Sequence, residues 1–125
     1  MKTVFAIAFA LAATPLFAAD FDAGMTAYDA GDYETALAEF SSLATQGHAQ
    51  AQSQLAWMYD NGRGVTQSYE SAFMWILLSI ENGNENGARA QDAIAGVLSA
   101  SAIKRAEARA EICRNSAYAD CGLSP

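Results

Sequence analysis

The sequence predicts an all-α fold, an α-α superhelix (solenoid) built from antiparallel hairpins of about six short helices. Apolar residues recur at the three- and four-residue spacing of helices, and no stretch alternates convincingly with the period of a strand. A short pattern also occurs twice. Its residues Tyr33 and Gly47 reappear as Tyr69 and Gly83, each 36 positions later (69 − 33 and 83 − 47). A self-match at this period is typical of a helical repeat array, a class of protein that generally provides binding surfaces.

Capping residues delimit the predicted helices. Asp22 can begin the first helix, Asp32 the second and Ser68 the fourth. The sixth helix begins at Ser99 or Ser101. The first five helices are expected at about residues 22–30, 32–47, 48–61, 68–83 and 88–98. Because the connections between them are short, consecutive helices should pack as antiparallel hairpins.

The N-terminal segment has the layout of a secretory signal peptide. Lys2 provides the positive start, residues 4–13 are apolar throughout, and Ala18 and Ala19 supply small residues for cleavage. The apolar run is shorter than the roughly 20 residues of a transmembrane helix, and Asp20 follows it. We therefore expect a periplasmic or secreted protein without stable membrane insertion. The chain divides into a signal peptide (1–19), a repeat domain (20–115) and a C-terminal tail (116–125).

The net charge of the chain narrows the class of molecule that it can bind. After loss of Lys2, six basic residues (7 − 1) face fourteen acidic ones, a formal charge of −8 (6 − 14). Such a surface repels phosphate backbones and anionic lipid headgroups. The expected partner is therefore a protein or peptide and not a nucleic acid, and the chain is expected to be monomeric.

Cys113 and Cys121 are the only two cysteines. An even cysteine count in an exported chain indicates a disulfide. The alternative is a redox site, but thioredoxin-type chemistry uses two intervening residues, and here there are seven (121 − 113 − 1). We expect a structural disulfide that holds the C-terminal segment.

No residue pattern indicates catalysis, a metal site or a cofactor. His48 is the only histidine and has no clustered cysteine or carboxylate beside it. Gly62 and Gly64 form no nucleotide-binding loop, because no lysine follows them, and they are expected in turns. Glu107 and Glu111 alternate with basic residues, as on a solvated, salt-bridged helix face.

The second copy of the repeated pattern has a more specific signature. It reads Ala51-x-x-x-Leu55-Ala56-x-Met58-Tyr59-x-x-Gly62-x-Gly64-Val65, followed by Tyr69-x-x-Ala72-x-x-Trp75 and Gly83. This segment resembles one complete Sel-one-like repeat, although Ala56 replaces the usual glycine. The first copy, around Tyr28 and Tyr33, is similar to the related tetratricopeptide repeat. The C-terminal cysteines around Tyr118 also resemble the ends of small exported members of this family. The resemblance implies an α-α superhelix that serves as a protein-interaction scaffold, often in bacterial envelopes.

Candidate binding residues are those that helix packing does not require. Trp57 lies about 200° around its helix from the core residue Leu55. Met74 and Leu78 lie opposite the main apolar face of their helix, where burial by a neighbouring hairpin is the favoured alternative to exposure. The candidate surface comprises Gln50, Ser53, Gln54, Trp57, Asp60, Met74 and Leu78.

Three functions are compatible with these features. The first is an exported, non-catalytic adaptor that presents a short helical groove to a protein or peptide. The second is a periplasmic regulator of an envelope signalling or secretion component, which differs from the adaptor only in its partner. The third is an enzyme acting on the cell wall or on β-lactams. The enzyme is disfavoured, because it would need a reactive serine or cysteine near a base, and the sequence contains no such pair.

Overall fold

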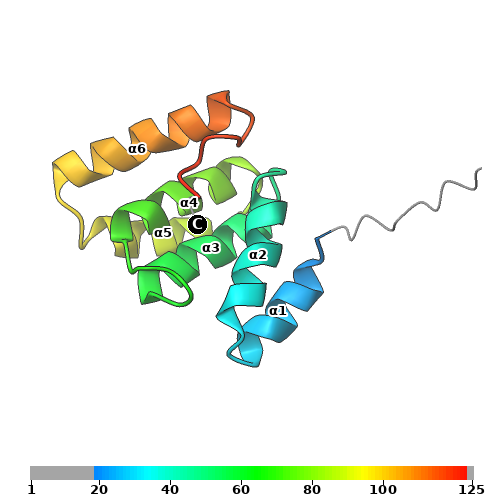
Figure 1. Ribbon diagram of the computed structural model, residues 1–125. Coiled ribbons are helices and arrows are strands. Elements are labelled where there is room, and N and C mark those ends of the chain that lie inside the picture. The colour runs from blue at the N-terminus through cyan, green and yellow to red at the C-terminus, as the bar shows by residue number, and fades with distance from the viewer. Residues whose placement is uncertain (1–18, 124–125) are drawn as a thin grey trace, which may run out of the picture.

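The computed structural model describes residues 19–123, which contain six α-helices and no strand. The helices are α1 (Phe21–Asp29), α2 (Tyr33–Ala44), α3 (Ala49–Asn61), α4 (Tyr69–Glu81), α5 (Gly87–Ala95) and α6 (Ala100–Asn115), as Figure 1 shows. The predicted all-α class and number of helices are thereby confirmed for this part of the chain. Apart from Ala19, the predicted signal peptide (1–19) lies outside the described residues. Within them, no helix is both long and apolar enough to cross a membrane.

Helix starts follow the repeat in the sequence. The side chains of Asp32 and Ser68, 36 positions apart (68 − 32), cap α2 and α4 by accepting from the backbone N–H groups of Thr35 and Ser71. The hydrogen bonds from Thr35 also hold the pKa of Asp32 below its usual value. The 36-residue spacing is therefore a spacing of helix starts.

The first helix begins two residues earlier than predicted. Asp20, and not Asp22, is its capping residue, and the Asp20 carboxylate accepts from the backbone N–H of Asp22 at 2.9 Å. An N-cap must precede the first helical residue, so the Asp20 side chain can reach a free N–H group of the first turn. Asp22 lies inside that turn, where its charge interacts favourably with the positive end of the helix dipole.

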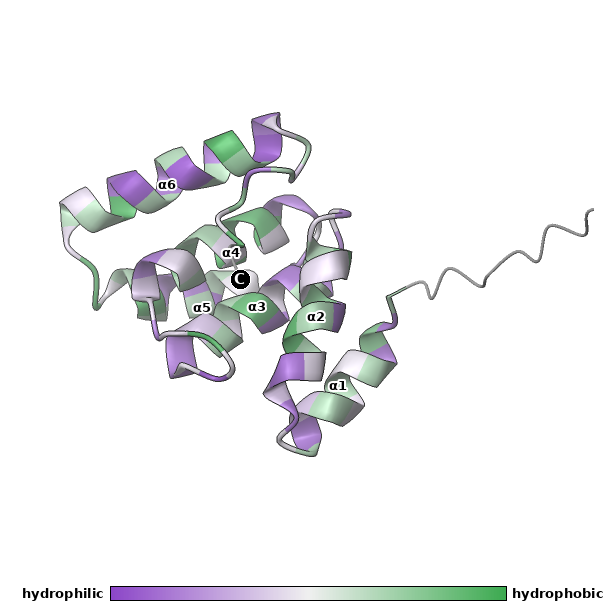
Figure 2. Ribbon diagram, viewed as in Figure 1, coloured by the Kyte–Doolittle hydropathy of each residue, from purple (hydrophilic) through white to green (hydrophobic). Residues whose placement is uncertain are grey.

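Helix α4 lies at the centre of the packing. It contacts α3 before it and both α5 and α6 after it, while α1 packs on α2 and α2 on α3. Figure 2 shows green, apolar residues where α2, α3 and α4 meet, and a largely purple outer surface on α6. The buried residues of α4 are Ser71, Ala72, Phe73, Met74, Trp75, Ile76, Leu78 and Ser79.

This packing corrects two of the predicted binding residues. Met74 and Leu78 are both 0% exposed, so neither lies on a binding surface. The physical reason is that α4 has neighbours on more than one side, and burial of its second apolar face removes a further stretch of hydrocarbon from water. The favoured alternative, burial by neighbouring helices, therefore holds for both side chains.

The predicted disulfide between Cys113 and Cys121 is present, and both cysteines are buried. The turn that it encloses places Ala117 and Tyr118 at positive φ, 52° and 65°, a region that non-glycine residues rarely adopt. Such a turn persists only when its surroundings fix it. We infer that the disulfide is one of the constraints that fix it.

A hydrogen-bond network joins this turn to the middle of the protein. The Tyr118 hydroxyl donates to Asn82 Oδ1 at 3.2 Å, and the Asn82 amide donates to Gln52 Oε1 at 2.9 Å. Gln52 is fully buried and donates in turn to the carbonyl of Ala44 at 3.0 Å. Among residues 19–123 every buried side-chain nitrogen or oxygen atom has a hydrogen-bond partner, so the network adds specificity to the packing without an unsatisfied side chain.

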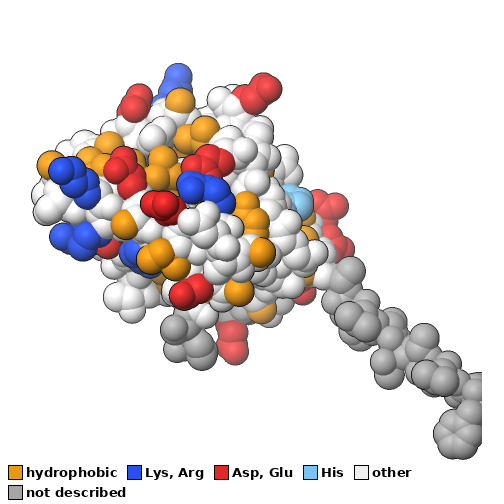
Figure 3. All heavy atoms as spheres, turned by 90° about the horizontal axis from the view of Figure 1, so that it is seen from above, with side chains coloured by type: hydrophobic (Ala, Val, Ile, Leu, Met, Phe, Trp, Pro, Cys, Tyr) orange, Lys and Arg blue, Asp and Glu red, His pale blue; other side chains and the backbone are white. Residues whose placement is uncertain are grey.

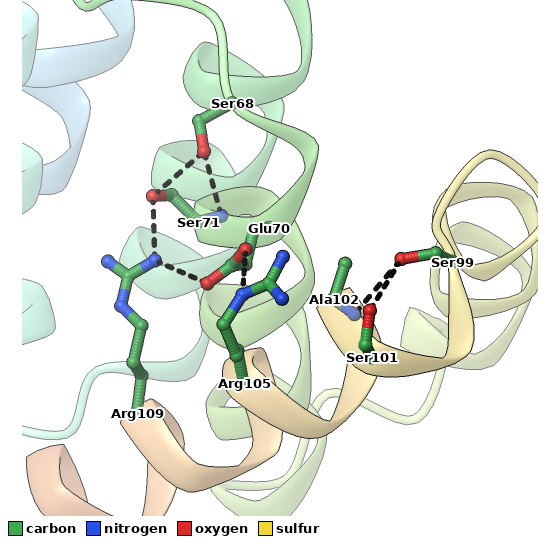
Figure 4. A network of polar contacts seen from close by, with 8 residues as sticks. All are labelled: Ser68, Glu70, Ser71, Ser99, Ser101, Ala102, Arg105 and Arg109. Atoms are coloured by element: carbon green, nitrogen blue, oxygen red, sulfur yellow. Dashed lines mark hydrogen bonds and ion pairs between the residues drawn. The ribbon is translucent and has the colours of Figure 1, made fainter.

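Ion pairs hold α6 on α4. Glu70 accepts from Arg105 at 3.2 Å and lies 3.7 Å from Arg109, which also donates to the Ser71 hydroxyl at 3.3 Å (Figure 4). Further along, Arg114 forms a bidentate pair with Glu81, at 2.8 and 2.6 Å. These partly exposed pairs contribute modestly to stability but fix the register of α6 against α4.

Loss of the disulfide should destabilise the fold. We expect the double variant C113S/C121S to lose about 2.5 kcal/mol of unfolding free energy, because its unfolded chain is no longer cross-linked. Urea denaturation followed by circular dichroism measures this loss. A reductant should shift the wild type by a similar amount and leave the double variant unchanged. Equal stability of wild type and variant would contradict a structural disulfide.

Burial of the second face of α4 makes Leu78 a strong test of the packing. We expect Leu78→Ala to lower the free energy of unfolding by about 2–5 kcal/mol, because it leaves a cavity in the core. Ile112 on α6 is 53% exposed and serves as the matched control. Its substitution by alanine should change stability by less than about 0.5 kcal/mol. Similar losses for the two variants in thermal denaturation would contradict the placement of Leu78.

Candidate binding groove

A groove of about 610 Å³ lies between α1, α3 and α5, with α4 contributing to its lining. Its volume is within the range of roughly 300–1,000 Å³ that is typical of ligand sites. The lining residues are Met25, Tyr28 and Asp29 from α1, Ser53, Gln54, Ala56, Trp57 and Asp60 from α3, Tyr69 and Ile76 from α4, and Ala90, Ala93, Ile94 and Val97 from α5 and the turn after it.

Four predicted residues of α3 line this groove together: Ser53, Gln54, Trp57 and Asp60. Their spacing of one, four and seven residues from Ser53 places them on one face of the helix. Leu55, on the other face, is fully buried in the core. The helical periodicity of α3 therefore separates a core face from a groove face, as the sequence indicated.

Trp57 is the largest side chain among the lining residues of the groove. It is 54% exposed, and its indole N–H donates to the Tyr28 hydroxyl at 2.9 Å, which joins α3 to α1. The Tyr28 ring packs edge-on against Tyr33, with centroids 5.2 Å apart. Arg63 in turn lies over the Tyr33 ring at 5.5 Å and donates to its hydroxyl at 3.3 Å. This series of contacts holds the exposed indole in one position.

Gln50 lies beside the groove and not in it. It lines a smaller hollow of about 200 Å³ together with Phe21 and Asn84, and Met25, Ser53 and Gln54 are common to the hollow and the groove. The predicted surface is therefore continuous along α3. Met74 and Leu78 lie in the core behind it, as described above.

The sequence-based prediction missed the contribution of two other helices. Helix α5 and the turn after it supply Ala90, Ala93, Ile94 and Val97, whose spacing of three, four and seven residues is that of one helix face. This pattern was present in the sequence, but periodicity alone does not reveal which neighbour a face looks toward. Helix α1 supplies Tyr28, whose role depends on the contact with Trp57.

His48, the only histidine, has a structural role, and the phenol of Tyr59 is partly buried. His48 caps α3 through its Nδ1, which accepts from the backbone N–H of Ala51 at 3.1 Å, and its ring stacks on Phe21. Burial raises the pKa of the half-buried Tyr59, an effect that Arg109 opposes, so this phenol stays protonated at neutral pH. Between residues 19 and 123, no group of three or more His, Cys, Asp or Glu side chains is placed to hold a metal ion.

The groove is open and mostly apolar, and it contains an exposed aromatic side chain that is hydrogen-bonded to a neighbouring helix. A fixed aromatic group contributes to binding at a low entropic cost. No protein-family model, curated protein or solved structure gives a significant match to the chain.

The hydrogen bond from Tyr28 should restrict the motion of Trp57. In Tyr28→Phe we expect a lower fluorescence anisotropy of Trp57 and stronger quenching by acrylamide, with a stability loss of about 0.5–1.5 kcal/mol. Trp75 is only 1% exposed and should contribute a constant, protected signal. Tyr69→Phe is the control, because Tyr69 also lines the groove but does not contact the indole N–H. Unchanged anisotropy in Tyr28→Phe would show that the indole is held by packing alone.

Proposed function

We propose that this protein is an exported, non-catalytic adaptor whose groove between α1, α3 and α5 binds a segment of another protein or a peptide. The observation that carries the proposal is the indole of Trp57, which is 54% exposed yet fixed by Tyr28 in a mostly apolar groove. Tryptophan and tyrosine are the residue types that most often dominate protein-binding energies. A large aromatic ring left in water is unfavourable for an isolated chain, and a partner would remove it from water.

The proposed architecture is a short array of three hairpins, α1 with α2, α3 with α4 and α5 with α6, similar to Sel-one-like repeats. It is supported by the capping residues Asp32 and Ser68, which have the repeat spacing, and by the groove, which is lined mainly by the first helix of each pair. In this arrangement α6 and the disulfide close the end of the array, and terminal elements of helical arrays have this role.

Export is the second part of the proposal. The signal-peptide layout of residues 1–19 supports it, and so does the buried disulfide, because such bonds persist in oxidising compartments. We place the mature chain in the periplasm or outside the cell, as a monomer. The structural roles of His48 and of both cysteines support a function that does not depend on catalysis.

Site-specific photo-crosslinking in cells that produce the protein tests the adaptor. A photoreactive residue at Ser53, in the groove, should give a discrete adduct with a partner, whereas one at Ala108, on the exposed face of α6, should give none. The adduct should disappear in Trp57→Ala and persist in the control Ile112→Ala, which replaces another exposed apolar side chain. Circular dichroism would verify that both variants fold. Equal adducts at the two positions, or an adduct that survives Trp57→Ala, would overturn the proposed groove.

A further inference from the structure

We infer that the occupant of the groove is a cationic amphipathic segment, a stretch of the partner in which lysine or arginine flanks apolar side chains. This inference rests on the proposed function, since it concerns the same groove, and it specifies the chemistry of the partner. Three observations support it: the distribution of charge along the chain, the engagement of most basic side chains elsewhere, and the position of two carboxylates beside Trp57.

Charge is divided unequally between the two halves of the folded chain. Residues 19–62 contain seven acidic side chains and no lysine or arginine, whereas residues 63–123 contain seven acidic and six basic ones. The formal charges are therefore −7 (0 − 7) and −1 (6 − 7). Figure 3 shows this division among the charged side chains: Lys and Arg (blue) lie over the left and centre of the view, whereas the charged side chains at the right, on the side of α1 and α2, are Asp and Glu (red). The acidic residues of the first half are Asp20, Asp22, Asp29, Asp32, Glu34, Glu39 and Asp60.

Most of the basic side chains are engaged away from the groove. Arg105, Arg109 and Arg114 pair with glutamates of α4 and hold α6 in place. Arg63 lies over the ring of Tyr33. No lysine or arginine among residues 19–123 lines the groove. The remaining two basic residues, Arg89 and Lys104, form no ion pair within residues 19–123, so no basic side chain of that part is paired with a carboxylate of the groove lining.

Two carboxylates, Asp29 and Asp60, line the groove together with Trp57. Asp29 directly follows Tyr28, the hydrogen-bond partner of Trp57, and Asp60 lies one helical turn beyond Trp57 on α3. Within residues 19–123 neither carboxylate forms an ion pair. An ammonium or guanidinium group that enters here meets both a carboxylate and the face of an indole, so ion pairing and cation–π attraction act together.

The rest of the lining requires an apolar component in the same segment. The apolar surface that the groove lining still exposes belongs mainly to Trp57, Tyr69 and Val97, which are 54%, 41% and 59% exposed. Their burial supplies affinity, while the carboxylates supply orientation and accelerate encounter with a positively charged partner. A second copy of this chain would bring another surface of net negative charge to the groove, and like-charge contact makes that occupant unfavourable.

Selection from a random peptide display library against the folded mature protein tests the inference. We expect the enriched peptides to combine lysine or arginine with leucine, isoleucine or an aromatic residue, and to bind more weakly as salt rises. Binding of synthetic copies should weaken by roughly three- to tenfold in the double variant D29N/D60N, as expected for the loss of two partly exposed ion pairs. The matched control D92N/E107Q removes two exposed charges outside the groove lining and should change affinity less than about twofold.

The outcomes separate this inference from the proposed function. Enriched peptides that depend on Trp57 but lack basic residues would overturn the cationic partner and leave the adaptor intact. Cationic peptides that bind D29N/D60N as well as the wild type would show unspecific attraction to the acidic surface, and would also overturn the inference. If no enriched peptide binds Trp57→Ala more weakly than the wild type, both the inference and the proposed function are overturned.

Discussion

The burial of α4 is the constraint on which the rest of the structure depends. Eight residues between Ser71 and Ser79 are buried, and they contact helices on several sides. Because α4 packs on both α3 and α5, it determines how far apart these two helices lie, and their separation defines the groove. Ile76 of α4 is nearly fully buried and still reaches the groove lining. The packing of α4 against its neighbours thus forms the core and also positions the proposed binding surface.

Helix α6 and the turn after it complete the burial of α4 largely through ion pairs, hydrogen bonds and a disulfide. The buried residues of α6 are the small side chains of Ala102, Ala106, Ala110 and Cys113, so its hydrophobic contribution is small. Two kinds of contact compensate for this. Ion pairs of arginines with Glu70 and Glu81 fix α6 on α4, and the disulfide fixes the turn that follows α6. Tyr118 then extends the connection to Asn82 and the buried Gln52. The packing around α4 is in this way completed without a further strongly apolar helix.

Local features of this protein could be predicted from the sequence, whereas long-range ones could not. The capping residues Asp32 and Ser68 and the groove face of α3 depend only on neighbours along the chain, and they are where the pattern placed them. Asp22 was wrong as the capping residue because Asp20 and Asp22, two positions apart, both suit a helix start. Met74 and Leu78 were wrong as surface residues because periodicity shows that a face is apolar but not what covers it. For the same reason α5 was missed as a wall of the groove.

The uneven distribution of charge along the chain can be related to the different roles of α6 and of helices α1 to α3. Arginines of α6 pair with glutamates of α4 and neutralise their charge there. Helices α1 to α3 have no basic residue, so their carboxylates repel one another, which disfavours the compact state. Repulsion of this kind has no evident structural benefit around Asp29 and Asp60, where the lining is mostly apolar. A positively charged partner would relieve it at the same position where the indole of Trp57 is left in water.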